Sequence, residues 1–294
     1  MVTPGDRAFF GEETSAEVVL ARTGPNADPR VKQIVESVVR HLHAVVKETE
    51  PTQEEWMKAI EFLTDTGKLC SDWRQEFILL SDALGVSMLV EAVNNRKPAG
   101  ETEATVLGPF YVADAPHYEN GANIALDGKG EPLWVSGRVL DVHRKPIAGA
   151  SIDVWQASPE GFYDVQQPDV QPRNNLRGRF TADEEGRFSF RSVYPRHYPI
   201  PHDGTVGKML TALDRHPNRP AHVHFMIRAP GFRSLTTHLF APDCPWLRDD
   251  AVFGVRESLI ADFHKSSDAA RAEALGVAVP FWEVAWDFVL SASA

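Results

Sequence analysis

The apolar positions between residues 34 and 46 recur at intervals of three and four, which is the spacing of one face of an α-helix. A second helix is predicted from Thr52, because Thr52 and Glu55 have the spacing of a capping box. This second helix is expected to bury Trp56, Ile60 and Leu63. A third helix is predicted from about residue 72 to 95, before a stretch that contains Pro and Gly.

After about residue 104 the apolar positions alternate and turn residues recur at short intervals. Strands are predicted over residues 135–140, 150–155, 178–182 and 187–193, followed by a surface helix over 252–264. The fold class is therefore predicted as mainly β, with an α-helical N-terminal domain and an antiparallel β-sandwich catalytic domain. The predicted domains are residues 1–103 and 104–294. Trp155 is expected in the sandwich core.

Composition restricts the class of protein. The net charge is −11, from 30 basic and 41 acidic residues, and no basic stripe is present, which excludes a nucleic-acid partner. No apolar run is long enough to span a membrane, so membrane insertion is not expected. Only Cys70 and Cys244 occur, without a zinc-type spacing, and the N-terminus lacks the layout of a signal peptide. A cytoplasmic location is expected.

The first candidate chemistry is the pair His222 and His224, which lie in a strand-like segment. Side chains at i and i+2 of a strand point to the same face, so both imidazoles could bind one metal ion. With 11 histidines in the chain, fewer than one such pair is expected by chance. Taken alone, however, the pair is more often two surface histidines than a metal site.

Tyrosine is scarce, with five residues in the chain. Tyr163 follows a predicted strand, and Tyr198 lies in a proline-rich stretch, with Tyr194 as a weaker rival. Two phenolates and two imidazoles would suit Fe(III) better than Cu(I) or structural zinc, because the oxygens are hard, anionic ligands. His197, His202, His216 and His238 are not expected to be ligands.

Several motifs, in this order and spacing, resemble those of the intradiol ring-cleavage dioxygenases of the catechol type. The resemblance covers nearly the whole chain and implies one Fe(III) per subunit, bound by Tyr163, Tyr198, His222 and His224. The motifs are Leu107-Gly108-Pro109-Phe110, Gly137-Arg138-Val139, Gly149-Ala150, Val154-Trp155-Gln156-Ala157, Gly161-Phe162-Tyr163 and Arg219-Pro220-Ala221-His222-Val223-His224-Phe225.

A finer resemblance, in residues 77–82, 198–207 and 250–255, is to the hydroxyquinol-cleaving subgroup. It implies cleavage of hydroxyquinol (benzene-1,2,4-triol) by O2 between the vicinal hydroxyls, giving 3-hydroxy-cis,cis-muconate and then maleylacetate. Catechol-selective relatives usually carry Gln where this chain has His238, and some hydroxyquinol enzymes carry an aromatic residue in place of Leu107. Catechol or chlorocatechol remains the alternative substrate.

The resemblance also implies roles for individual residues. Tyr198 would leave the metal and accept a substrate proton, while Arg219 would face the negative charge that develops on the ring. Asp82 is expected to accept a hydrogen bond from the third hydroxyl of hydroxyquinol. The residues expected to contact substrate are Leu79, Asp82, Val106, Leu107, Gly108, Pro109, Phe110, Ile200, Pro201 and Arg219.

Two other protein classes fit parts of the pattern. A β-sandwich can be a binding module without catalysis, but such a module has no reason to gather two Tyr and two His. A cupin would need a Glu five residues after His224, where this chain has Ala229. The apolar helical ridges suggest a homodimer seam, and the resemblance implies dimerisation through these helices, often with a phospholipid bound there.

Overall fold

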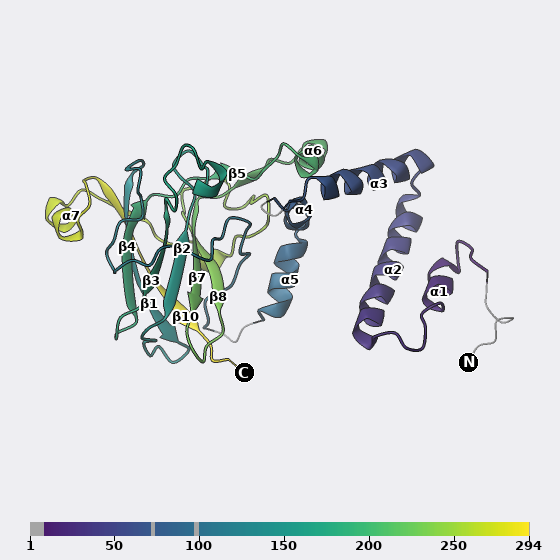
Figure 1. Ribbon diagram of the computed structural model, residues 1–294, viewed down its shortest axis with the longest axis horizontal. Helices are drawn as coiled ribbons and strands as arrows, with labels where there is room; N and C mark the ends of the chain where they lie inside the picture. The colour runs from purple at the N-terminus through teal and green to yellow at the C-terminus, as the bar shows by residue number, and fades with distance from the viewer. Residues whose placement is uncertain (1–8, 72–73, 97–99, 294) are drawn as a thin grey trace. The chain divides into compact units, whose positions relative to one another are not determined.

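The computed structural model describes residues 9–71, 74–96 and 100–293. The chain divides into two compact units, Met1–Thr64 and Asp65–Ala294. The first unit contains α1 (Ser15–Leu20), α2 (Pro29–Thr49) and most of α3 (Gln53–Lys68), and the second contains all the strands (Figure 1). This division falls before the predicted boundary at residues 103 and 104, which stays a prediction.

The first two predicted helices correspond to α2 and α3. The carboxylate of Asp28 caps α2 by accepting from Val31 N–H at 2.8 Å. The predicted capping box of α3 is confirmed, because Thr52 N–H donates to the Glu55 carboxylate at 2.8 Å and Glu55 N–H donates to Thr52 Oγ1 at 3.2 Å. The expected burial of Trp56, Ile60 and Leu63 is wrong for the single chain, where these side chains are 42–48% exposed.

The third predicted helix is two helices, α4 (Glu76–Ala83) and α5 (Val86–Asn94). Gly85 between them has φ of 74°, a left-handed conformation that ends α4 and redirects the chain. The apolar period continues across this break, which is why the sequence pattern alone predicted one helix. The predicted start near residue 72 lies outside the described residues.

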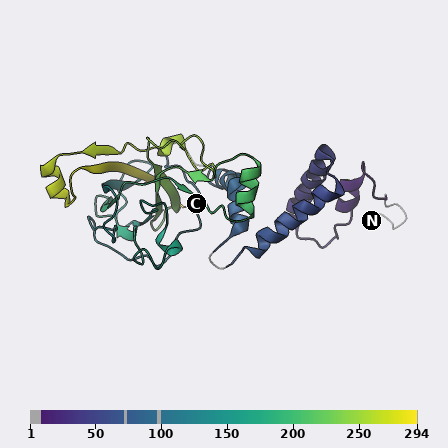
Figure 2. The ribbon, with the colours of Figure 1, turned by 90° about the horizontal axis from the view of Figure 1, so that it is seen from above.

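Two four-stranded sheets pack face to face and form the sandwich (Figures 1 and 2). The four predicted strands are confirmed as β1 to β4, and the two sheets run β4-β1-β10-β9 and β3-β2-β7-β8. Pairing is antiparallel except between β1 and β10, which are parallel. The strand bounds are β1 Pro132–Asp141, β2 Ser151–Trp155, β3 Arg177–Thr181, β4 Arg187–Val193, β7 His222–Arg228, β8 Leu235–Phe240, β9 His264–Ser266 and β10 Phe281–Leu290.

Aromatic side chains from both sheets fill the core. Phe180, Phe190, Phe225 and Phe288 are fully buried, and Phe180 stacks on Phe190 with ring centroids 5.1 Å apart. Fully burying a side chain of this size stabilises a fold by roughly 1.5–3 kcal/mol. The core therefore provides a rigid support for the loops at the ends of the strands.

The predicted surface helix over residues 252–264 is wrong. This segment contains one short 3-10 turn, η3 (Glu257–Leu259), and leads into β9. The helix near the C-terminus is α7 (Ala269–Leu275), which connects β9 to β10 (Figure 2). Phe253 has φ of 59°, which is incompatible with a continuous right-handed helix. The backbone instead bonds to neighbouring segments, as Ala261 N–H does to Phe240 O at 3.0 Å.

A short ladder and two helices lie beside the second sheet. The ladder pairs β5 (Tyr198–Pro199) with β6 (Asn218–Arg219), and α6 (Thr205–Ala212) lies near α4 (Figure 1). The buried Glu76 carboxylate of α4 accepts hydrogen bonds from Val206 N–H at 3.1 Å and from Thr205 Oγ1 at 3.3 Å. This contact fixes the segment that carries Tyr198 against α4.

Candidate metal centre and active site

Four side chains converge at one end of the second sheet and present two phenol oxygens and two imidazole nitrogens. Tyr163 Oη lies 3.1 Å from Tyr198 Oη and 3.0 Å from His224 Nε2. His224 Nε2 in turn lies 3.1 Å from His222 Nε2. Two ligands that bind one metal at about 2.1 Å and at a right angle are about 3.0 Å apart. The spacing therefore fits four donors around a single ion.

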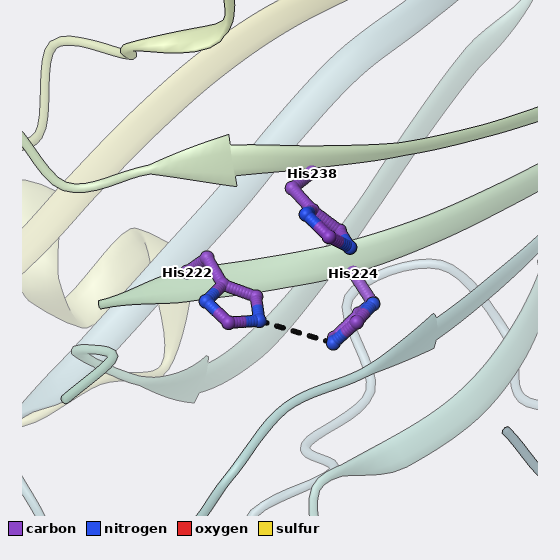
Figure 3. A group of neighbouring side chains, drawn as sticks. All are labelled: His222, His224 and His238. Atoms are coloured by element: carbon purple, nitrogen blue, oxygen red, sulfur yellow. Dashed lines mark hydrogen bonds between the residues drawn. The ribbon is translucent and has the colours of Figure 1, made fainter. Parts of the chain in front are cut away.

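Each donor is positioned by the local fold. His222 and His224 start β7, and the alternation of the strand puts both rings on one face (Figure 3). Tyr163 comes directly before η2 (Asp164–Gln166), in the connection that follows β2. Tyr198 belongs to β5 and pairs with Arg219 of β6, which brings the arginine next to the donors.

The two imidazoles are neutral lone-pair donors. Burial lowers the pKa of His222 and of His224 well below the usual value. Arg219 lowers the pKa of His222 further, and His238, His222 and Arg219 lower that of His224 further. His222 Nδ1 lies 2.6 Å from Pro220 O, so it carries the proton and leaves Nε2 free to bind a metal.

The phenol of Tyr163 needs a nearby cation before it can ionise at neutral pH. Burial, with the neighbouring Tyr198 as a second cause, raises the pKa of Tyr163 well above the usual value, while Arg219 and Arg177 oppose the rise. Only a strong local positive charge such as Fe(III) would deprotonate this buried phenol at neutral pH. The chemistry of the donor set, as well as its spacing, therefore fits a trivalent hard metal.

Arg219 is the cationic group nearest to the donors. Its side chain is 5% exposed, and Nη1 lies 3.5 Å from His222 Nε2. Asp250 fixes the other side of the guanidinium, with Nε to Oδ1 at 3.2 Å and Nη2 to Oδ2 at 3.4 Å. Asp250 lies in the 250–255 run that resembles the hydroxyquinol-cleaving subgroup, but the sequence assigned it no role, since the partner of a carboxylate in a loop is not known before the fold.

Apart from Arg219 of β6, the residues expected to contact substrate come from three segments. The first is α4 with Leu79 and Asp82, both nearly buried. The second is residues 106–110, of which Val106, Leu107 and Pro109 are at least partly exposed. Gly108 lies close to the metal-site histidines, because a Cβ added to it would be 3.5 Å from His224 Cε1. Phe110 stacks on Tyr163 with ring centroids 4.5 Å apart. The third holds Ile200, buried, and Pro201, half-buried.

The surroundings of the donors differ from expectation at two aromatic residues. Trp155 does not join the main sandwich core but belongs to a separate buried cluster with Tyr163 and Tyr198, and it stacks on His224. His238, which was not expected to be a ligand, lies beside both histidines, with one ring nitrogen of each within 4.8 Å of the others (Figure 3). Tyr194 instead packs in the main core and donates to Asp243.

Comparison with known proteins identifies the family. The dioxygenase family model matches residues 106–292, and the model of the catechol dioxygenase N-terminus matches residues 28–102. Together with the relatives described next, these matches show that the chain belongs to the intradiol ring-cleavage dioxygenases.

Several relatives of the chain are enzymes named for hydroxyquinol. The chain is 60% identical to a hydroxyquinol 1,2-dioxygenase of Rhizobium sp. (strain MTP-10005), over 99% of both chains. It is 49% identical to a 6-chlorohydroxyquinol 1,2-dioxygenase of Cupriavidus pinatubonensis, over 88% of this chain and 94% of the relative. The crystal structure of hydroxyquinol 1,2-dioxygenase from Pseudomonas putida DLL-E4 superposes with a TM-score of 0.89 at 48% identity, over 96% and 99% of the two chains.

Proposed function

We propose that this chain cleaves the ring of hydroxyquinol between its vicinal hydroxyls with O2, using one Fe(III) per subunit held by Tyr163, Tyr198, His222 and His224. The product would be 3-hydroxy-cis,cis-muconate, which ketonises to maleylacetate. The observation that carries the proposal is the convergence of the four donors, with neighbouring atoms 3.0–3.1 Å apart. The 60% identity to a hydroxyquinol 1,2-dioxygenase supports the choice of substrate.

The chain's own residues would bind, orient and deprotonate the substrate. Bound Fe(III) would supply a Lewis acid that a catecholic ring can chelate and that makes the ring reactive toward O2. Tyr198 would accept a substrate proton at Oη. Arg219, fixed by Asp250, would stabilise negative charge that develops on the ring, and because it is already buried and oriented, little reorganisation is needed.

Asp82 is the residue that would select hydroxyquinol over catechol. Its carboxylate is 7% exposed, and the one further hydroxyl of hydroxyquinol would give it a hydrogen-bond donor. A substrate without that hydroxyl leaves the buried group without this donor, which discriminates strongly. Catechol remains the second candidate, because the chain is also 38% identical to a catechol 1,2-dioxygenase of Candida albicans; chlorocatechol is the third.

The N-terminal helices would form a homodimer interface. The apolar face of α2 and α3 is exposed in the single chain, and a second copy would cover it. We also propose that a phospholipid binds at this interface. The helical domain would end at residue 103 and the catalytic domain would begin at residue 104. No helix among the described residues is long and apolar enough to cross a membrane, and a cytoplasmic location is proposed.

A visible spectrum of the purified protein tests the proposed function, followed by anaerobic titration with hydroxyquinol and with catechol. A tyrosinate-to-Fe(III) band that shifts on addition of substrate is the expected result, with tighter binding of hydroxyquinol. Tighter binding of catechol would reverse the order of substrates. A protein that stays colourless after reconstitution with Fe(III) would eliminate the Tyr2His2 site and favour a binding module without catalysis.

A further inference from the structure

The two histidines of the candidate metal site are oriented by different means. His222 is held by a hydrogen bond, since its Nδ1 lies 2.6 Å from Pro220 O. His224 Nδ1 is buried and has no hydrogen-bond partner among the residues that the structure describes. Metal-binding histidines almost always donate their second ring N–H to a fixed acceptor, which sets the plane of the ring. Within the described part of the chain, something other than a hydrogen bond must therefore set the plane of His224.

The His224 ring is enclosed between two other aromatic rings. In the sheet, His224 of β7 pairs directly with Trp155 of β2 on one side and with His238 of β8 on the other. The indole of Trp155 stacks on the imidazole, with centroids 4.6 Å apart and planes inclined by 15°. His238 stands nearly perpendicular to the imidazole, with centroids 4.1 Å apart and planes inclined by 83° (Figure 3). All three side chains are at most 1% exposed.

The contacts of the His238 side chain are mainly ring contacts and not hydrogen bonds. Neither of its ring nitrogens has a partner of strict hydrogen-bond geometry in the described chain, but a looser hydrogen bond with the backbone of Val106 raises its pKa against the effect of burial. Its ring contacts those of His222 and His224, at centroid distances of 4.7 Å and 4.1 Å. A buried polar ring with so few hydrogen bonds costs stability, and its side-chain contacts include the rings of both metal-site histidines.

We propose that Trp155 and His238 are positioning residues that clamp the imidazole of His224 in the plane required for metal binding. A close-packed interior resists rotation of a ring whose two faces are both covered. Packing against these two rings would fix the ring plane of His224, as the hydrogen bond to the Pro220 carbonyl fixes the ring plane of His222. This inference rests on the proposed iron site, and neither Trp155 nor His238 is itself a ligand in it.

Holoprotein variants at the two clamping positions test this inference. His238→Ala and Trp155→Leu each uncover one face of His224, whereas His238→Gln and Trp155→Phe keep a flat group there. Leu239→Ala is the matched control, because Leu239 is a fully buried neighbour of His238 on the opposite face of the same strand. The measurements are the half-time of iron release to excess Fe(III) chelator and the spread of rhombicity in the high-spin Fe(III) EPR signal.

The two uncovering variants should release iron about tenfold faster than the wild type, in line with the loss caused by removing outer supports of metal ligands. Their EPR signal should broaden, while the two flat replacements stay within about twofold of the wild type. Iron release and EPR no different from those of Leu239→Ala would overturn the clamp. If one uncovering variant does not fold, the pair at the other position decides the question.

The same experiment separates this inference from the proposed function. A wild-type protein that binds no iron and shows no tyrosinate band would refute the Tyr2His2 site, and the clamp with it. A wild-type protein that binds iron normally, with variants unchanged, would refute only the clamp and would assign the orientation of His224 to a group outside the protein chain.

Discussion

At the scale of single residues, Asp82 shows how burial prepares a side chain for one substrate. Burial raises the pKa of this carboxyl above its ordinary value; a hydrogen bond with Ser87 and the charge of Arg219 oppose the rise, and Asp250 adds to it. The group is therefore a poorly solvated carboxyl for which Ser87 is one hydrogen-bond partner. A substrate hydroxyl that donates to it would regain part of the free energy lost on burial.

Replacing Asp82 should change substrate preference. Asp82→Ala is expected to lower kcat/KM for hydroxyquinol by about 10–100-fold, because an unmet hydrogen bond to a buried polar group costs about 1–3 kcal/mol. The value for catechol should change by less than about threefold, since catechol has no hydroxyl for Asp82 to bind. Steady-state kinetics on both substrates measure the ratio, and equal losses on both would remove Asp82 from this role.

The same carboxyl predicts a pH effect. Since the pKa of Asp82 is raised, the carboxylate becomes protonated at a higher pH than an ordinary Asp, whose pKa is about 3.9. Protonation removes the charged acceptor, so KM for hydroxyquinol should rise relative to KM for catechol as the pH is lowered toward this range. In Asp82→Asn the KM ratio should not depend on pH. A ratio that depends equally on pH in wild type and variant would contradict the assignment.

Gly254 is a second residue whose identity matters to the site. A Cβ at this position would lie 2.8 Å from Arg219 Nη2 and 3.1 Å from Asp250 Oδ2. Because Asp250 holds the guanidinium in a buried place, Gly254→Ala should displace Arg219. We expect kcat/KM to fall by about tenfold, roughly the value of one charge-assisted hydrogen bond, with iron content unchanged. In Gly24→Ala, where the added methyl meets nothing within 4 Å, activity should stay at the wild-type level.

At the scale of elements, a buried ion pair joins η2 to β3 beside the candidate site. Arg177 Nε lies 2.7 Å from Asp164 Oδ1, and Arg177 Nη1 donates to Phe110 O at 2.7 Å. The two charged side chains are 2% and 5% exposed. Asp164 follows Tyr163 directly, and Phe110 stacks on the Tyr163 ring. The Arg177–Asp164 ion pair therefore fixes the loop that carries Tyr163.

Breaking this pair should cost far more than breaking a surface pair. Arg177→Met leaves Asp164 buried without its cation, and the expected loss is about 3–5 kcal/mol in the free energy of unfolding. Arg138→Met is the control, because the Arg138–Asp287 pair is 49% and 31% exposed and should contribute at most about 1 kcal/mol. Urea unfolding measures both, and similar losses in the two variants would argue against a structural role for the buried pair.

At the scale of the whole molecule, the exposed apolar face of α2 and α3 needs an explanation. Leu42 is 60% exposed and Trp56 is 48% exposed, and neither helix gains enough cover within its own unit. A contiguous exposed apolar face usually marks an interface. A second copy of the chain, related by a two-fold axis, would present the same face in return.

Charges placed on this face should prevent self-association. Leu42→Asp is expected to shift the mass in solution from twice the chain mass of 32.7 kDa to the single value, because the carboxylate would be buried without a partner. Arg40→Glu changes an exposed position that is not part of the apolar series and should leave the dimer intact. Light scattering after size exclusion measures both. A wild-type chain at the monomer mass would refute the proposed interface.

Periodicity and motif order in the sequence were sufficient for much of the fold. The capping box at Thr52 and the turn at Gly186 depend on contacts within a few residues, so the local sequence determines them. The strands on either side of this turn, β3 and β4, pair with β2 and β1 and not with each other, although their alternating pattern still predicted them. The break at Gly85 and the absence of a helix at Phe253 were not predicted. Both depend on left-handed backbone conformations that an apolar period does not reveal.

The donor residues were predicted from the sequence because the chemistry of Tyr and His is carried by residue type, and the i, i+2 spacing of His222 and His224 fixes their common face. The supports of these donors could not be predicted. Trp155 meets His224 only through strand pairing, and Asp250 meets Arg219 only through the return of a loop from a distant segment. Local sequence thus determined the elements and the candidate ligands, whereas the tertiary structure alone decided which residues orient them, because contacts between distant segments depend on packing.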